Sequence, residues 1–298
     1  MIDFQTFWHD MRHEHQAFVN HTGVDFEVIP KGLSVKINDL SWRVDWLRYS
    51  SVGDHLIYGW IATPENHQSS KEAFVWLPGY SYGTPTPDSS NLVKHATTIC
   101  INLHGNLPDH PYINPAGKDD YIGNGLESPE TYVYKNMALH CLLAVDVATK
   151  LDGINPNKIV IAGMSQGGGL ALITAAHHPN VKLCFADMPF LCDIRNAVFE
   201  TKRAAYQSLR DAVGDSEERL ATVELFDPLF HAPLLTLPTH ITAGGRDPAS
   251  RVETVRPVYP QIGSQIKAFR FFPEAGHVFV KEMPGIYRKW MNHVFFDD

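Results

Sequence analysis

The sequence predicts an α/β fold around a mostly parallel sheet, and three observations lead to that prediction. Short apolar runs bounded by glycine, proline or polar residues recur along the chain, and several are apolar throughout, as in strands covered on both faces. Segments with helical periodicity separate these runs, which favours right-handed crossovers between parallel strands. No repeat or linker divides the chain, so we expect one domain over residues 1–298.

Eight segments are predicted to be strands. The first, at 41–46, alternates polar and apolar residues, as expected near a sheet edge, and residues 1–40 before it form an N-terminal extension. The other seven lie at 56–63, 73–77, 98–103, 158–162, 182–186, 239–243 and 268–272.

Helices are predicted between and after these strands. The clearest has Ser128 as N-cap, Pro129 in its first turn and Gly153 just past its end. Others are expected at 167–178, 192–213, 216–224 and 284–294, and those within about 190–230 form a helical cap over a site. Residues 105–128 lack periodicity, and a loop of that length is usually functional, an assembly contact or disordered.

Composition excludes several classes of partner. Twenty-five Lys and Arg against 33 Asp and Glu leave a net charge of −8, and no basic run exceeds a pair such as Lys202-Arg203, which argues against nucleic acid. Charged residues interrupt the N-terminal region before any apolar run, so we expect no signal peptide or membrane span and a cytoplasmic protein. The four cysteines, which lack C-x-x-C spacing, are expected to be buried reduced thiols: Cys100, Cys141, Cys184 and Cys192.

Two serines stand in the Gly-x-Ser-x-Gly pattern of a nucleophile elbow, Ser81 and Ser165, and both follow predicted strands. An elbow is a strand, a strained turn and then a helix. Three glycines and Leu-Ala-Leu follow Ser165, whereas Thr-Pro-Thr-Pro follows Ser81 and prevents an immediate helix. Ser165 is therefore the predicted nucleophile.

The other elbow sequence fits a different role. Acyl transfer needs two N–H donors for the developing oxyanion, one after the nucleophile and one in the loop after the third predicted strand. Gln166 and Tyr80 occupy those positions. A rival second donor, His104-Gly105, follows the next strand, which is one strand late.

A serine nucleophile needs a base and an acid to orient it, in the chain order Ser, Asp or Glu, His. His277 follows the last predicted strand on a glycine-containing loop, and Asp247 follows the strand before it. Asp187, Asp193 and Asp227 remain as alternatives for the acid. Position argues against the other downstream histidines, which lie on helices, ahead of a strand or at its start: His177, His178, His231, His240 and His293.

Two further patterns imitate other sites. His9, His13 and His15 resemble metal ligands, but without an H-E-x-x-H or Cys/His set a solvated amphipathic helix explains them better. The glycines at 167–169 match neither G-x-G-x-x-G nor the phosphate-binding loop with its lysine. We therefore expect no metal and no nucleotide cofactor.

Nearly the whole chain resembles carbohydrate esterase family seven, the acetyl xylan esterases and cephalosporin C deacetylases of the α/β-hydrolase superfamily. The segments that carry the likeness are Asp3-Phe4, Phe7-Trp8, Tyr58-Gly59-Trp60, Pro78-Gly79-Tyr80, Thr131-Tyr132-Val133-Tyr134, 165–170, 186–192, 245–247 and Gly276-His277. Two positions depart from the family: Pro78 replaces a histidine, and His104-Gly105-Asn106 replaces Arg-Gly-Gln.

The resemblance implies an α/β-hydrolase fold and the same site residues: Ser165 as nucleophile, Asp247 as acid, His277 as base, and Tyr80 and Gln166 as oxyanion hole. It also implies an intracellular, metal-independent enzyme that deacetylates small sugars and often assembles as a hexamer. The alternatives are a prolyl-oligopeptidase-like peptidase, for which the chain lacks propeller repeats, and a catalytically silent binding protein, although no triad residue is missing.

Overall fold

The structure is a computed structural model and describes the chain except for residues 1–2, 66–70, 81–83, 104–120, 201–203 and 297–298. Its nine described strands form one sheet in the order β1-β2-β3-β5-β4-β6-β7-β8-β9. The strands are β1 (Phe26–Ile37), β2 (Leu40–Ser51), β3 (His55–Pro64), β4 (Ala73–Leu77), β5 (Thr97–Ile101), β6 (Ile159–Met164), β7 (Val181–Asp187), β8 (Thr239–Gly244) and β9 (Lys267–Phe272).

The sheet is antiparallel at one end and parallel over the rest. β1, β2, β3 and β5 pair antiparallel in that order, and all pairs from β5 to β9 are parallel. The central strands β4 and β5 are buried along their whole length, which agrees with the uninterrupted apolar sequence of β4, whereas β5 begins with two buried threonines. The carboxyl ends of the parallel strands therefore meet at one edge of the sheet.

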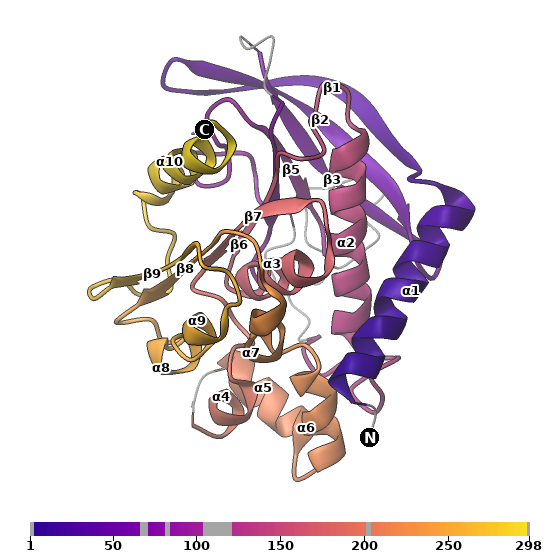
Figure 1. Cartoon of the computed structure of the whole chain (residues 1–298), viewed down its shortest axis with the longest axis vertical. Helices are drawn as coiled ribbons and strands as arrows, with labels where there is room; N and C mark the ends of the chain where they lie inside the picture. The colour runs from indigo at the N-terminus through magenta and orange to yellow at the C-terminus, as the bar shows by residue number, and fades with distance from the viewer. Residues whose placement is uncertain (1–2, 66–70, 81–83, 104–120, 201–203, 297–298) are drawn as a thin grey trace.

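Each face of the sheet has its own apolar core. In β4, Val75 and Leu77 join the core that includes α1 (Phe4–Thr22), α2 (Val133–Lys150) and α3 (Gln166–His177), because alternate side chains of a strand point to opposite faces. Phe74 and Trp76 join the other core, to which α10 (Met283–Phe296) contributes Tyr287. Figure 1 shows α2 and α3 on the opposite side of the sheet from α10.

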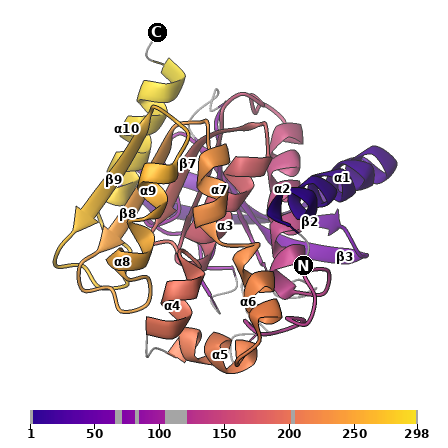
Figure 2. The same ribbon diagram turned by 60° about the horizontal axis from the view of Figure 1, so that its bottom comes forward.

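The remaining helices follow β7 and β8. They are α4 (Ile194–Glu200), α5 (Ala204–Val213), α6 (Glu217–Glu224), α7 (Pro228–His231), the short 3₁₀ helix Ala232–Leu234, α8 (Val252–Val255) and α9 (Val258–Gln261). α4, α5 and α6 lie together at the end of the molecule nearest the N-terminus (Figures 1 and 2). The predicted helix 192–213 is thus divided into α4 and α5, and residues 201–203 between them lie outside the described part.

The N-terminal extension contains a strand that the sequence did not predict. Every residue of β1 is exposed or half-buried, and its apolar alternation is confined to two short stretches, 26–28 and 33–37, which Pro30, Lys31 and Gly32 separate. Its pairing with β2 shifts register between Ile29 and Leu33. The Asp45 carboxylate on β2 accepts hydrogen bonds from the N–H groups of Lys31 and Gly32 at this irregularity, at 2.9 and 3.4 Å. A contact between strands therefore stabilises β1 where its own sequence does not.

The predicted start of the helix after β5 is wrong by four residues. Ser128 and Pro129 form turns, and α2 begins at Val133 after an extended Tyr132. The Ser128 hydroxyl does accept the N–H of Glu130, at 3.2 Å. The carbonyl of Ser128 instead accepts the N–H groups of Thr131 and Tyr132, which closes a turn and delays the helix.

Candidate active site

Ser165 lies in a sharp turn between β6 and α3. Its φ of 59° and ψ of −122° fall in a region that residues with a side chain rarely adopt. Its N–H donates to the Asp187 carbonyl at 2.9 Å, and its carbonyl accepts the N–H of Phe190 at 2.8 Å. Hydrogen bonds to the last residue of β7 and to the loop after it therefore hold the strained backbone that characterises a nucleophile elbow.

The glycines around Ser165 are required by close backbone contacts. A Cβ on Gly167 would lie 1.9 Å from the carbonyl oxygen of Leu77, and one on Gly163 would lie 2.4 Å from the carbonyl carbon of Gly167. Two residues before and two after the serine, the backbone thus has no room for a side chain. The two glycines of the Gly-x-Ser-x-Gly pattern are therefore explained by this close packing of the backbone.

Asp247 and His277 are in direct contact, as their loop positions predicted. Asp247 Oδ2 lies 2.8 Å from His277 Nδ1, and the Asp247 side chain is 0% exposed against 24% for His277. Asp247 Oδ1 accepts the N–H groups of Ala249 and Ser250 at 2.7 and 2.9 Å, which fixes the carboxylate. In a neutral imidazole the proton then sits on Nδ1 and leaves Nε2 as the basic nitrogen.

The three predicted catalytic residues follow strands of the same parallel set. Ser165 follows β6, Asp247 follows β8, and His277 follows β9, which pairs with β8 through Gly244 and Phe272. All three loops therefore leave the sheet at the edge formed by its carboxyl ends, the usual place for sites in open α/β sheets.

The two predicted oxyanion residues face the same region from β4 and α3. Tyr80 lies in the turn after β4 and is half-buried, whereas Gln166 is the first residue of α3 and is fully buried. The first N–H groups of a helix have no partner within the helix, which suits Gln166 for binding an anion. The rivals Ser81 and His104-Gly105 lie outside the described residues, as does Asn106.

The sequence did not single out the partners of Gln166. The hydroxyls of Tyr121 and Tyr134 donate to Gln166 Oε1 at 2.9 and 2.8 Å. The N–H of Tyr121 donates to the Tyr80 hydroxyl at 3.1 Å. Tyr134 belongs to a segment that resembled the esterase family. Tyr121 lies in the aperiodic loop 105–128, where no sequence motif marked it as a residue of the site.

The alternative acids have other partners. Asp187 receives hydrogen bonds from the hydroxyls of Thr242, at 3.3 Å, and Tyr287. Burial raises the pKa of Asp187 to about 7, in opposition to those hydrogen bonds. Asp227 caps α7 and accepts the N–H groups of Leu229, Asp193 and Ile194. The Asp193 carboxylate binds the side-chain amide of Asn196 at 2.7 Å.

Two of the rejected histidines belong to a polar chain beneath α1. Arg12 donates to His177 Nδ1 at 3.0 Å, His177 Nε2 lies 2.9 Å from His231 Nδ1, and His231 Nε2 donates to the Leu225 carbonyl at 3.1 Å. Burial lowers the pKa of His177 to about 2 and that of His231 to about 3, so both imidazoles are neutral. Trp8 stacks on His177 at 4.2 Å, which docks α1 against α3.

His15 is separate from His9 and His13 and meets Asp146 and His178. These three side chains are the only group in the described part that could hold a metal ion. However, His178 Nδ1 accepts the N–H of Asn180 at 3.2 Å, so the ring proton is on Nε2, which donates to Asp146 at 3.2 Å. Burial opposes ionisation of Asp146, but the hydrogen bonds from His15 and His178 outweigh it and lower the pKa of Asp146 to about 2. The group is therefore a hydrogen-bonded cluster around the Asp146 carboxylate.

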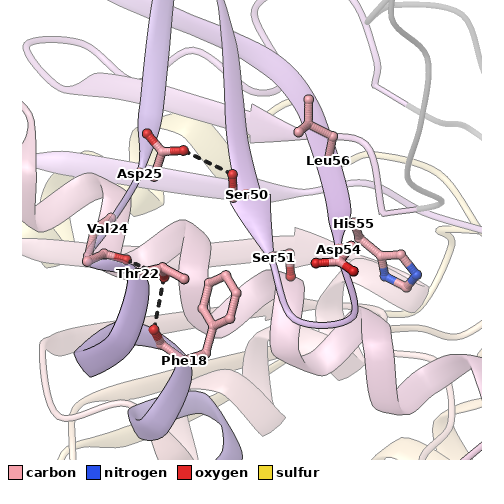
Figure 3. A pocket seen from close by; sticks show the side chains of 10 residues that line it. Phe18, Thr22, Val24, Asp25, Ser50, Ser51, Asp54, His55 and Leu56 are labelled. Carbon is pink, nitrogen blue, oxygen red and sulfur yellow. Dashed lines mark hydrogen bonds between the residues drawn. The ribbon is translucent and has the colours of Figure 1, made fainter.

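A hollow of about 540 Å³ with mixed polar and apolar walls lies between the C-terminal end of α1 and the β2–β3 hairpin (Figure 3). The Ser50 hydroxyl at its wall donates to Asp25 at 3.1 Å. None of the five predicted site residues lines it, and β5 and β4 separate the hairpin from β6 in the sheet. The hollow is therefore distinct from the elbow edge.

Comparison with known proteins identifies the family. A model of the acetyl xylan esterase (AXE1) family matches residues 2–293. The chain belongs to the acetyl xylan esterase family. The expected resemblance is thus confirmed.

Individual relatives agree with this family. Acetyl esterase Axe7A of Xylanibacter ruminicola is 31% identical over 134 residues, which are 44% of this chain and 30% of that protein. The chain therefore spans less than a third of the length of this curated relative.

Two solved structures share the architecture. The acetyl xylan esterase of Paenibacillus sp. R4 has a TM-score of 0.83 at 21% identity, over 99% of this chain and 95% of that one. Acetyl xylan esterase 1 of Thermoanaerobacterium sp. has a TM-score of 0.80 at 19% identity, over 98% and 94% of the two chains. The predicted α/β-hydrolase fold is confirmed. No helix among the described residues has the length and apolar character needed to cross a membrane.

Proposed function

We propose that this chain is a serine carboxylic ester hydrolase that removes acetyl groups from small acetylated sugars or similar acetyl esters. The observation that carries the proposal is the Asp247–His277 hydrogen bond of 2.8 Å at the sheet edge from which the strained Ser165 turn also leaves. Membership of the acetyl xylan esterase family supports the ester and the acetyl group as substrate class.

In the proposed mechanism His277 Nε2 takes the proton of the Ser165 hydroxyl as its oxygen attacks the ester carbonyl carbon. Asp247 holds the imidazole and stabilises its positive charge. The N–H groups of Tyr80 and Gln166 bind the oxyanion of the tetrahedral intermediate. The imidazolium then protonates the leaving alcohol, and water, deprotonated by the same histidine, releases acetate from the acyl-enzyme. Each step uses groups of this chain, so the proposal includes no metal.

The test is hydrolysis of p-nitrophenyl acetate, butyrate and octanoate, beside a peptide amide, by wild type, Ser165→Ala and Ser81→Ala. We expect wild type and Ser81→Ala to prefer the acetate, and Ser165→Ala to be inactive. Cleavage of the peptide amide in preference to the esters would favour a peptidase, and no turnover of any substrate would favour a binding protein. Activity that survives in Ser165→Ala but vanishes in Ser81→Ala would reverse the choice of nucleophile.

We also propose a cytoplasmic homo-oligomer, with a hexamer as the assembly that the family resemblance suggests. All four cysteines are buried and free, which suits a reducing compartment. Sedimentation of the purified protein tests the assembly, and a monomer at micromolar concentration would contradict it. Cell fractionation of the source organism tests the location.

A further inference from the structure

The side chain of Gln166 is a buried amide held by two tyrosine hydroxyls. Gln166 is 0% exposed, and its Oε1 accepts hydrogen bonds from Tyr121 and Tyr134 at 2.9 and 2.8 Å. Its Nε2 is buried and has no hydrogen-bond partner among the described residues. The two hydroxyls are therefore the polar contacts that orient this side chain.

Tyr121 also contacts the other proposed oxyanion residue. Its N–H donates to the Tyr80 hydroxyl at 3.1 Å, and the two rings lie 4.3 Å apart at 33°. Tyr121 thus joins residues that come from separate elements, the turn after β4 and the start of α3. Tyr134, in the first turn of α2, completes the group from a third element.

These contacts bear on the direction of a main-chain donor. The Gln166 N–H follows directly on Ser165, whose φ of 59° sets the turn, and rotation of the Gln166 backbone would move this N–H and the Gln166 side chain together. A donor that stabilises an oxyanion acts only if it points to where the negative charge develops. Burial raises the pKa of Tyr134 well above its usual value, so its hydroxyl keeps its proton at working pH.

We propose that Tyr121 and Tyr134 are positioning residues that hold Gln166, and through Tyr121 also Tyr80, in the geometry that binds the oxyanion. This inference rests on the serine esterase function proposed above. The tyrosines touch neither the acyl group nor the nucleophile in this scheme, and they act through Gln166 and Tyr80.

The test compares Tyr121→Phe, Tyr134→Phe and the double variant with Tyr132→Phe in hydrolysis of p-nitrophenyl acetate. Tyr132 is the matched control because it is a buried tyrosine of the same cluster whose hydroxyl donates to the Ile122 carbonyl at 3.0 Å and not to Gln166. Loss of a complete oxyanion donor lowers kcat by about 10²–10³, so we expect about a 10-fold loss for each single variant and about 100-fold for the double. KM should stay within about twofold, because ground-state binding is spared.

A change in kcat alone does not distinguish positioning of Gln166 from a general loss of packing around the tyrosines. Gln166→Leu is therefore combined with each tyrosine substitution in a double-mutant cycle. It keeps the backbone N–H but removes the acceptor of both hydroxyls. In that background the tyrosine substitutions should lower kcat by less than about twofold. If one phenylalanine variant fails to fold, the other still forms a cycle with Gln166→Leu.

Two results would overturn the inference. One is a kcat for Tyr121→Phe and Tyr134→Phe that matches Tyr132→Phe at similar melting temperatures. The other is a loss of equal size in the wild-type and Gln166→Leu backgrounds. Either result leaves the proposed function intact if wild type hydrolyses the ester and Ser165→Ala does not. An inactive wild type would instead overturn the proposed function itself.

Discussion

His240 in β8 is a buried imidazole whose surroundings oppose protonation. It is 3% exposed, and its ring centroid lies 6.0 Å from that of Phe185 and 5.4 Å from that of Trp290. Its Nδ1 has no hydrogen-bond partner among the described residues. Burial, with a smaller contribution from Arg270, lowers the pKa of His240 to about 4, whereas an imidazole in an unfolded chain has a pKa of about 6.5.

Replacement of His240 by phenylalanine should make the protein less sensitive to acid. Between pH 6.5 and 4 the unfolded wild-type chain binds a proton at His240 that the folded chain does not, so the free energy of unfolding falls as the pH falls. From these two pKa values, His240 lowers the stability of wild type by about 0.2 kcal/mol at pH 7 and by about 2 kcal/mol at pH 5. His240→Phe should therefore lose about 2 kcal/mol less than wild type on going from pH 7 to pH 5.

The assay is urea unfolding followed by tryptophan fluorescence at both pH values. Comparison of each protein with itself at the two pH values cancels any packing change that phenylalanine introduces. Phe185→Leu is the matched control, since it disturbs the same ring cluster without a titrating group and should lower stability equally at pH 7 and pH 5. Equal losses for His240→Phe and wild type between the two pH values would refute the reasoning.

Three further substitutions test the site and the elbow. Asp247→Asn removes the negative charge beside His277 but keeps an oxygen that accepts the N–H groups of the loop. The kcat for p-nitrophenyl acetate should therefore fall by roughly 10³–10⁴-fold with little change in melting temperature. A loss of kcat below about 10-fold would exclude Asp247 as the acid. Gly167→Ala places a Cβ 1.9 Å from the Leu77 carbonyl oxygen and should lower the free energy of unfolding by about 3 kcal/mol or more. Gly285→Ala in α10 has open space and should raise it by about 0.5 kcal/mol, and equal effects at the two glycines in urea unfolding would contradict the packing argument.

Local patterns were sufficient for the parallel half of the molecule. β4 is apolar at every position and was predicted with its observed limits, because a strand covered on both faces needs no polar residue. β1 was missed because Pro30 and Gly32 interrupt its apolar alternation, and the hydrogen bonds that stabilise this irregularity come from Asp45 on the neighbouring strand. The start of α2 was misplaced because the Ser128 carbonyl is used in a turn, and hydrogen bonds of the main chain leave no mark in residue type.

In the candidate site, too, some features could be predicted from local sequence and others could not. The elbow around Ser165 is readable because the glycines that its packing requires lie within two residues of it, and the loop positions of Asp247 and His277 follow from the order of the strands. Their contact spans 30 residues and agrees with that order. Tyr121 has no comparable local signal, since its hydroxyl meets Gln166 45 residues away.

The sequence by itself determined the parallel strands, the strained turn at Ser165 and the loop positions of Asp247 and His277, since each depends on neighbours in the chain or on strand order. Only the tertiary structure decided which polar groups meet across elements. His177 pairs with His231, His178 with Asp146, and two tyrosine hydroxyls converge on Gln166. The physical reason is that a hydrogen bond forms within about 3 Å, a distance set by how helices and strands pack rather than by their separation along the chain.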